Sequence, residues 1–87
     1  MPTKEDLARV WAEKKAVVRI GKSGLVDGIV EEVIRQLKKQ RIIKVRFLRT
    51  ATVEMDVDAL AATLAERTES EVWGRRGSVV VLALRRR

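Results

Sequence analysis

Four residues in the first third of the chain, Gly21 to Gly24, read Gly-Lys-Ser-Gly and combine groups that can hold a phosphate. Lys22 supplies a positive charge and Ser23 a hydroxyl donor, while the two glycines let the backbone turn sharply and a ligand approach closely. A helix after the turn would add free backbone N–H groups for an anion. Two interpretations are open: the end of a nucleotide-binding P-loop, or a GxxG turn that contacts a nucleic-acid backbone.

The residues before the turn argue against the P-loop. The pattern G-x-x-x-x-G-K-[S/T] needs a glycine at position 16, and the chain has Ala16 there. Residues 17–20 are VVRI, and branched side chains resist the positive φ values that wrap a loop around phosphates. The sequence therefore favours the GxxG turn, for which a tight connection that uses glycine only for its shape is the alternative.

The composition further limits the kinds of catalytic or metal site that the chain can form and indicates the class of its partner. The 87 residues include no Cys and no His, so disulfides, thiolate metal sites and the commonest general base are all missing. A carboxylate-only magnesium site, a lysine nucleophile or a Ser/Lys pair is the remaining alternative, and we expect no enzymatic activity, no catalytic residue, no metal or other cofactor and no small-molecule substrate. The 19 Lys and Arg outnumber the 12 Asp and Glu, which gives a net charge of +7 and an isoelectric point near 10.6. This excess favours a polyanionic partner, although a highly charged, heat-adapted protein is the alternative.

The sequence carries no signal for export or membrane insertion. Residues 1–15 are charged throughout, unlike a signal peptide, and no apolar run approaches the roughly 18 residues that span a bilayer. We expect a cytoplasmic, monomeric protein without membrane contact, in which residues 1–87 form one domain.

Hydrophobic spacing predicts an α/β fold with the element order α-β-α-β-α-β-β. Thr3 and Asp6 have the spacing of a capping box for the first helix, and Asp56 or Asp58 can cap the third. Strands joined through helices favour parallel neighbours, and the last pair should be antiparallel, which gives a four-stranded mixed sheet packed with helices. The expected elements are helices over 4–15, 25–40 and 57–64, strands over 16–20, 42–49, 71–73 and 78–84, and a turn over 74–77.

Several of the expected helices, strands and turns carry basic residues that could lie near the GxxG turn. If the order of strands brings them together, they form one basic surface around the turn, whereas each one singly is more simply a solvated charge. The residues are Lys14, Lys15, Arg19, Lys44, Arg46, Arg49, Arg75 and Arg76. Aromatic residues are only 3% of the chain, and Trp11, Phe47 and Trp73 are assigned to the core or its rim, so we expect contacts with phosphates and RNA shape rather than stacked bases.

The segment of residues 17–47, VVRIGKSGLVDGIVEEVIRQLKKQRIIKVRF, resembles the CRM domain of bacterial YhbY-type ribosome-associated proteins and plant organelle intron-splicing factors. The shared features are the strand ending at Ile20, the GKSGL turn, Gly28, the strand from Ile43 to Phe47, and Gly74 with the apolar run SVVVLAL near the end. Val26 stands where the family usually has Thr, which leaves Asp27 to cap the following helix.

This resemblance implies a fold akin to the C-terminal domain of bacterial translation initiation factor three, with the GxxG turn and nearby basic residues contacting RNA. Stand-alone members, which a chain of this length resembles, are associated with precursors of the large ribosomal subunit. We therefore predict a protein that binds structured RNA in ribosome assembly; the alternative is a protein–protein adaptor on ribosomal particles whose turn contacts no RNA. The predicted RNA-binding residues are Gly21, Lys22, Ser23, Gly24, Lys14, Lys15, Arg19, Arg75 and Arg76.

Overall fold

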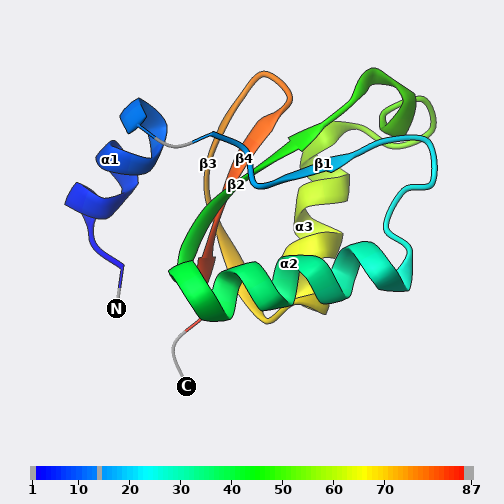
Figure 1. Cartoon of the computed structure of the whole chain (residues 1–87). Helices are drawn as coiled ribbons and strands as arrows, with labels where there is room; N and C mark the ends of the chain where they lie inside the picture. Colours follow the sequence, from blue (N-terminus) through cyan, green and yellow to red (C-terminus); the bar gives the residue numbers. More distant parts are fainter. Residues whose placement is uncertain (1, 14, 86–87) are drawn as a thin grey trace.

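The computed structural model describes residues 2–13 and 15–85, and it has the predicted order of helices and strands (Figure 1). A short 3-10 helix, η1, is added between the second strand and the third helix. The elements are α1 (Lys4–Glu13), β1 (Val18–Ile20), α2 (Asp27–Gln40), β2 (Ile42–Phe47), η1 (Arg49–Ala51), α3 (Val57–Arg67), β3 (Ser70–Arg76) and β4 (Val79–Leu84).

The four strands form one mixed sheet in the order β1-β2-β4-β3. β1 runs parallel to β2, while β4 runs antiparallel to both β2 and β3. The prediction of a mixed sheet with a parallel pair and a terminal antiparallel hairpin is therefore confirmed. The helix α2 connects the two parallel strands, as such a crossover requires.

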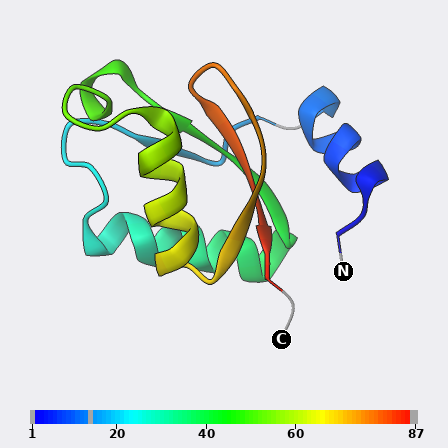
Figure 2. The ribbon, with the colours of Figure 1, turned by 180° about the vertical axis from the view of Figure 1, so that it is seen from behind.

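The two faces of the sheet are covered differently. The larger apolar cluster joins one face to α2 and α3, through buried residues such as Val33, Leu64 and Phe47. A smaller cluster joins the other face to α1, through Val10 and Ile42 among others. Seen from opposite sides, α1 stands apart from α2 and α3 with the sheet between them (Figures 1 and 2).

Alternation along β2 decides which side chains face which layer. Ile43, Val45 and Phe47 are buried in the cluster beneath α2 and α3, as the sequence predicts. The intervening side chains of Lys44 and Arg46 must then lie on the α1 face, because successive residues of a strand point to opposite sides. Arg46 is exposed and Lys44 is half-buried.

The predicted helix caps are right at two helices and wrong at one. Thr3 and Asp6 form the capping box of α1, since the Thr3 backbone N–H donates to Asp6 Oδ2 at 2.9 Å and the Asp6 N–H donates to Thr3 Oγ1 at 3.2 Å. Asp56 caps α3 by accepting from the Ala59 N–H at 2.8 Å. The prediction that Asp27 caps α2 is wrong: Val26 is the N-cap residue, and its side chain makes no cap hydrogen bond.

The expected turn over residues 74–77 is also wrong. β3 continues through Arg76, with a bulge between Val72 and Gly74, and the hairpin turns at Gly77 and Ser78. Gly74 lies within the strand, where it leaves room for Trp11: a Cβ atom there would be 3.3 Å from Trp11 Cζ2. β1 is shorter than expected, and residue 14, at the expected end of the first helix, lies outside the described residues.

Candidate nucleic-acid interface

Three segments that are far apart in the sequence meet at one end of the sheet. The Leu48 N–H donates to the Ile20 carbonyl at 2.8 Å, which fixes the end of β2 beside the end of β1. The Phe47 N–H donates to the Ser78 carbonyl, also at 2.8 Å, which adds the turn of the β3–β4 hairpin. The GxxG turn, the start of η1 and the hairpin turn therefore follow the same end of the sheet; in Figure 1 the hairpin turn and η1 are uppermost, and the GxxG turn lies at the right, below η1.

The GxxG turn is a tight, exposed connection between β1 and α2. The Gly24 N–H donates to the Gly21 carbonyl at 2.9 Å, and Gly24 has a φ of +69°, a value that residues with a Cβ rarely adopt. Lys22 and Ser23 form the tip, and both are exposed. The turn thus presents an ammonium group and a hydroxyl group to solvent on a defined backbone.

A shallow, open hollow of about 450 Å³ lies between this turn and the first turn of α2. Val26, Gly28 and Ile29 line its helix side. The first N–H groups of a helix have no partner within the helix, and no side chain caps α2. The hollow therefore combines the Lys22 and Ser23 side chains with backbone donors suited to an anion.

Arg67, at the end of α3, holds the exit from the turn in place. Its guanidinium donates to the Leu25 carbonyl at 2.6 Å and to Asp27 Oδ1 at 3.1 Å. Asp27 is thus the partner of an arginine forty residues away rather than a helix cap. The contact attaches the GxxG turn to α3, and it offsets the negative charge of Asp27 at the start of α2.

The structure divides the basic residues that the sequence placed around the turn. Arg75 and Arg76 are neighbours in β3 and point to opposite faces. Arg75 donates to Asp58 Oδ2 at 3.0 Å and to the Gly77 carbonyl at 2.9 Å, so it is held on the α3 side. Arg76 lies on the α1 side, with its guanidinium carbon 4.4 Å from the centre of the Trp11 ring.

Lys15 is not at the same end of the sheet as the turn. Lys15 is exposed and precedes β1, whereas the turn follows β1, so the length of that strand separates them. Lys14 lies outside the described residues. Arg19, within β1, is exposed and only two residues from Gly21.

Arg46 is not among the residues predicted from the sequence to bind RNA. Arg46 in β2 is the direct neighbour of Arg19 in β1, and both are exposed. The alternation of β2 places Arg46 on a polar face, but its pairing with Arg19 depends on the register of two strands separated by α2. Arg67 was missed for a similar reason, because its partners are remote in sequence.

Trp11 is half-buried against the smaller apolar cluster, which agrees with its assignment to the core. Two cations accompany its ring: the Arg76 guanidinium, and Lys44 Nζ at 5.4 Å from the ring centre. Lys44 Nζ also donates to the Trp11 carbonyl at 3.1 Å. Trp11 therefore supports basic side chains on the α1 face.

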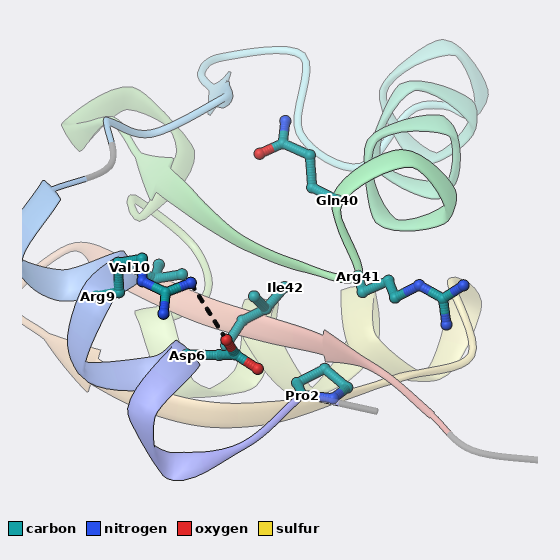
Figure 3. A pocket seen from close by; sticks show the side chains of 7 residues that line it. All are labelled: Pro2, Asp6, Arg9, Val10, Gln40, Arg41 and Ile42. Carbon is teal, nitrogen blue, oxygen red and sulfur yellow. Dashed lines mark hydrogen bonds and ion pairs between the residues drawn. The ribbon is translucent and has the colours of Figure 1, made fainter.

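A second hollow, of about 320 Å³, lies between α1 and the start of β2 (Figure 3). Asp6 and Arg9 pair across its wall at 3.5 Å, and the Arg41 side chain points away from this pair. The hydrogen bond from the Thr3 backbone lowers the pKa of Asp6 below its ordinary value of 3.8. This hollow adjoins Arg41 and Ile42, at the beginning of β2, so it is at the opposite end of that strand from the GxxG turn.

Residues 2–13 and 15–85 contain no group of three or more Asp, Glu, His or Cys side chains placed to hold a metal ion. Within the same ranges, each helix is too short or too polar to cross a membrane.

The fold and the turn together define a small α/β domain with a GxxG turn and basic side chains at one end of a mixed sheet. The chain belongs to the CRS1/YhbY (CRM) domain family, whose model matches residues 3–83. The resemblance seen in the sequence is thereby confirmed. The chain is also similar to a hypothetical protein from Staphylococcus aureus, described with its solution structure as a candidate RNA-binding protein. The two share 26% identity and a TM-score of 0.73 over 100% of this chain and 92% of the other. No curated protein gives a significant match.

Proposed function

We propose that this protein binds structured RNA through the end of the sheet that carries the GxxG turn, and that it acts in assembly of the large ribosomal subunit. The exposed Lys22–Ser23 tip, beside the uncapped start of α2, is the observation that carries the proposal. Membership of the CRM family, the candidate RNA-binding neighbour and the net charge of +7 support RNA as the partner. The protein acts as one monomeric domain without catalysis.

In the bound state, Lys22 Nζ contacts a phosphate oxygen and the Ser23 hydroxyl donates to the same or an adjacent phosphate. Gly21 and Gly24 leave room for the sugar-phosphate chain, and the N–H groups at the start of α2 add dipole attraction. Such contacts recognise backbone and shape rather than base sequence. Lys15, beyond the other end of β1, contributes only long-range attraction.

The salt dependence of RNA binding tests this proposal. Affinity for a structured RNA hairpin is measured by fluorescence anisotropy between 50 and 200 mM salt. Lys22→Ala should lower the slope of log K against log salt by roughly 0.7–0.9, because one phosphate contact is lost. Lys38→Ala is the matched control, since Lys38 is an exposed lysine at the far end of α2. Affinity that does not change with salt, or equal effects of the two substitutions, would contradict the proposal.

The adaptor alternative makes a different prediction for ribosomal particles. If the protein joins precursors of the large subunit through RNA, then Lys22→Glu should abolish its co-sedimentation with them, while Lys38→Glu should not. Normal co-sedimentation of the Lys22→Glu variant would favour protein–protein contacts instead.

A further inference from the structure

The α1 face of the sheet carries a line of arginines that the strand register brings together. Arg19 of β1 pairs with Arg46 of β2, Arg46 pairs with Val79 of β4, and Val79 pairs with Arg76 of β3. We call Arg19, Arg46 and Arg76 the arginine row. We propose that the arginine row is a second RNA-binding surface, which contacts phosphates of the RNA bound at the GxxG turn; this inference rests on the proposed function.

All three arginines lie on the same face. Arg19 is flanked by Val18 and Ile20, which are buried beneath α2 and α3, so its own side chain points to the α1 side. Arg46 is flanked in the same way by Val45 and Phe47. Arg76 is placed there by its contact with Trp11 of α1.

The spacing of the row suits a chain of negative charges. Neighbouring strands are about 4.8 Å apart, so Arg19 and Arg46 are adjacent and the whole row spans about 14 Å across the sheet. Arg19, the first member of the row, is only two residues before Gly21, so the row begins close to the GxxG turn. Guanidinium groups bind phosphate oxygens through two parallel hydrogen bonds, which makes arginine well suited to this contact.

Among the described residues, the arginine row shares with Arg41, Arg49 and Arg85 the absence of a carboxylate partner. Arg9, Arg35, Arg67 and Arg75 each form an ion pair with Asp or Glu. In the described part of the chain, none of the three row arginines forms such a pair, and all three are exposed. Like charges placed side by side on adjacent strands destabilise a sheet. A polyanion laid across the row would remove this repulsion.

Trp11 prepares Arg76 for binding. The guanidinium stacks over the indole ring at 4.4 Å, which occupies one face of the guanidinium and leaves the N–H donors at its edge available. Gly74 precedes Arg76 by two residues in the same strand, and a larger residue there would meet the ring. Trp11 is therefore a positioning residue for Arg76 rather than a surface for stacked bases.

The test compares two triple variants with the same change in charge. The first is Arg19→Gln, Arg46→Gln and Arg76→Gln; the control is Lys4→Gln, Lys38→Gln and Lys39→Gln, three exposed lysines outside the row. The row variant should lower the slope of log K against log salt by about 2 to 3 for an RNA hairpin, and the control should stay close to the unmodified protein. Equal slopes for the two variants would overturn the inference.

Measurements on the same samples separate the ways in which this inference can fail. If the unmodified protein binds no RNA, both the proposed function and the arginine row are wrong. If it binds RNA with dependence on Lys22, and the row variant behaves like the control, then the row alone is wrong. Stronger row-dependent binding to phosphatidylserine vesicles than to RNA would assign the surface to membranes and overturn the inference. The melting temperature of the row variant should equal or exceed that of the unmodified protein, and a clear decrease would indicate a structural role instead.

Trp11 fluorescence gives an independent readout. The chain has two tryptophans, so Trp73→Phe leaves Trp11 as the sole emitter. RNA binding should change the Trp11 emission, and Arg76→Gln should greatly reduce that change. An RNA-induced change that persists in full without Arg76 would contradict contact at this position.

Discussion

Arginines on the two faces of the sheet have different interaction partners. Beneath α2 and α3, a large apolar cluster fills the interface, and the arginine that reaches this side, Arg75, is paired with Asp58. On the other face, one short helix covers a small apolar cluster, and Arg76 lies against Trp11 with no carboxylate partner among the described residues. Arg75 and Arg76 are adjacent in the sequence, but the charge of Arg75 is balanced by Asp58, whereas the charge of Arg76 can attract an anionic ligand.

This difference shows why net charge alone is a poor guide to a binding surface. Each strand alternates between the two layers, so a basic run is divided between them. The face with the larger core contributes most of the stability of the fold, and the other face can then carry unpaired cations. We expect substitutions on the first face to change stability and those on the second to change binding.

The largest expected effect is on the cores themselves. Phe47 is 1% exposed in the larger cluster, and Phe47→Ala should lower the free energy of unfolding by about 3–5 kcal/mol. Val10 is 3% exposed in the smaller cluster, and Val10→Ala should lower it by about 1–2 kcal/mol. Denaturation in urea measures both. A larger loss for Val10→Ala would mean that α1, rather than α2 and α3, anchors the fold.

The next effect concerns the contact that joins the GxxG turn to the larger layer. Arg67→Ala removes the hydrogen bonds to Leu25 and Asp27, which should lower stability by about 1 kcal/mol and weaken RNA binding several-fold by loosening the turn. Arg35→Ala is the control, because among the described residues Arg35 pairs only with Glu32 of its own helix. Hydrogen exchange at residues 21–26 should rise in the Arg67 variant and stay unchanged in the control. Equal exchange in both variants would show that the turn keeps its shape without Arg67.

The smaller effects on stability should have opposite signs on the two faces. Arg75→Gln removes an exposed ion pair and should lower stability by about 0.2–1 kcal/mol. Arg46→Gln removes repulsion with Arg19 and should raise stability by a similar amount, about 0.2–1 kcal/mol, at low salt. Thermal melts at 20 mM and 500 mM salt check this prediction, since both differences should shrink with screening. Two changes of the same sign would contradict the contrast between the faces.

The smallest effect is a dependence of α1 on pH. The pKa of Asp6 is lowered below 3.8, chiefly by the hydrogen bond from the Thr3 backbone. The folded state therefore favours the ionised carboxylate, so the stabilisation is present above pH 3.8 and is lost as the pH falls below that value toward the folded pKa. The helix α1 should fray in acid before the larger layer unfolds, as followed by Trp11 fluorescence in the Trp73→Phe protein. In an Asp6→Asn variant this acid transition should be absent, and its persistence would assign it to another group.

Much of the fold could be predicted from the sequence because its signals are local. The apolar spacing of 27–40, the Thr3–Asp6 box and the alternation of 42–47 each arise within a few residues. The turn over 74–77 was misplaced because two glycines suggest a turn, whereas Gly74 serves a close approach by Trp11, sixty-three positions earlier.

The candidate site was predictable only in part for the same reason. The GxxG turn consists of four consecutive residues, so it can be recognised in the sequence, and its exposure could be expected. The pairing of Arg19 with Arg46 requires the parallel register of β1 and β2, and the Arg67 contact crosses from α3 to the start of α2. The separation of Arg75 from Arg76 follows from alternation only once β3 is known to extend through both residues.

The most direct test of the account compares Arg75 with Arg76. Arg75→Gln and Arg76→Gln remove the same charge from adjacent positions of one strand. We predict that Arg76→Gln lowers the salt slope of RNA binding by roughly 0.7–0.9, while Arg75→Gln leaves it close to that of the unmodified protein. Equal slopes for the two variants, or a larger decrease for Arg75→Gln, would contradict the claim that RNA lies along the α1 face.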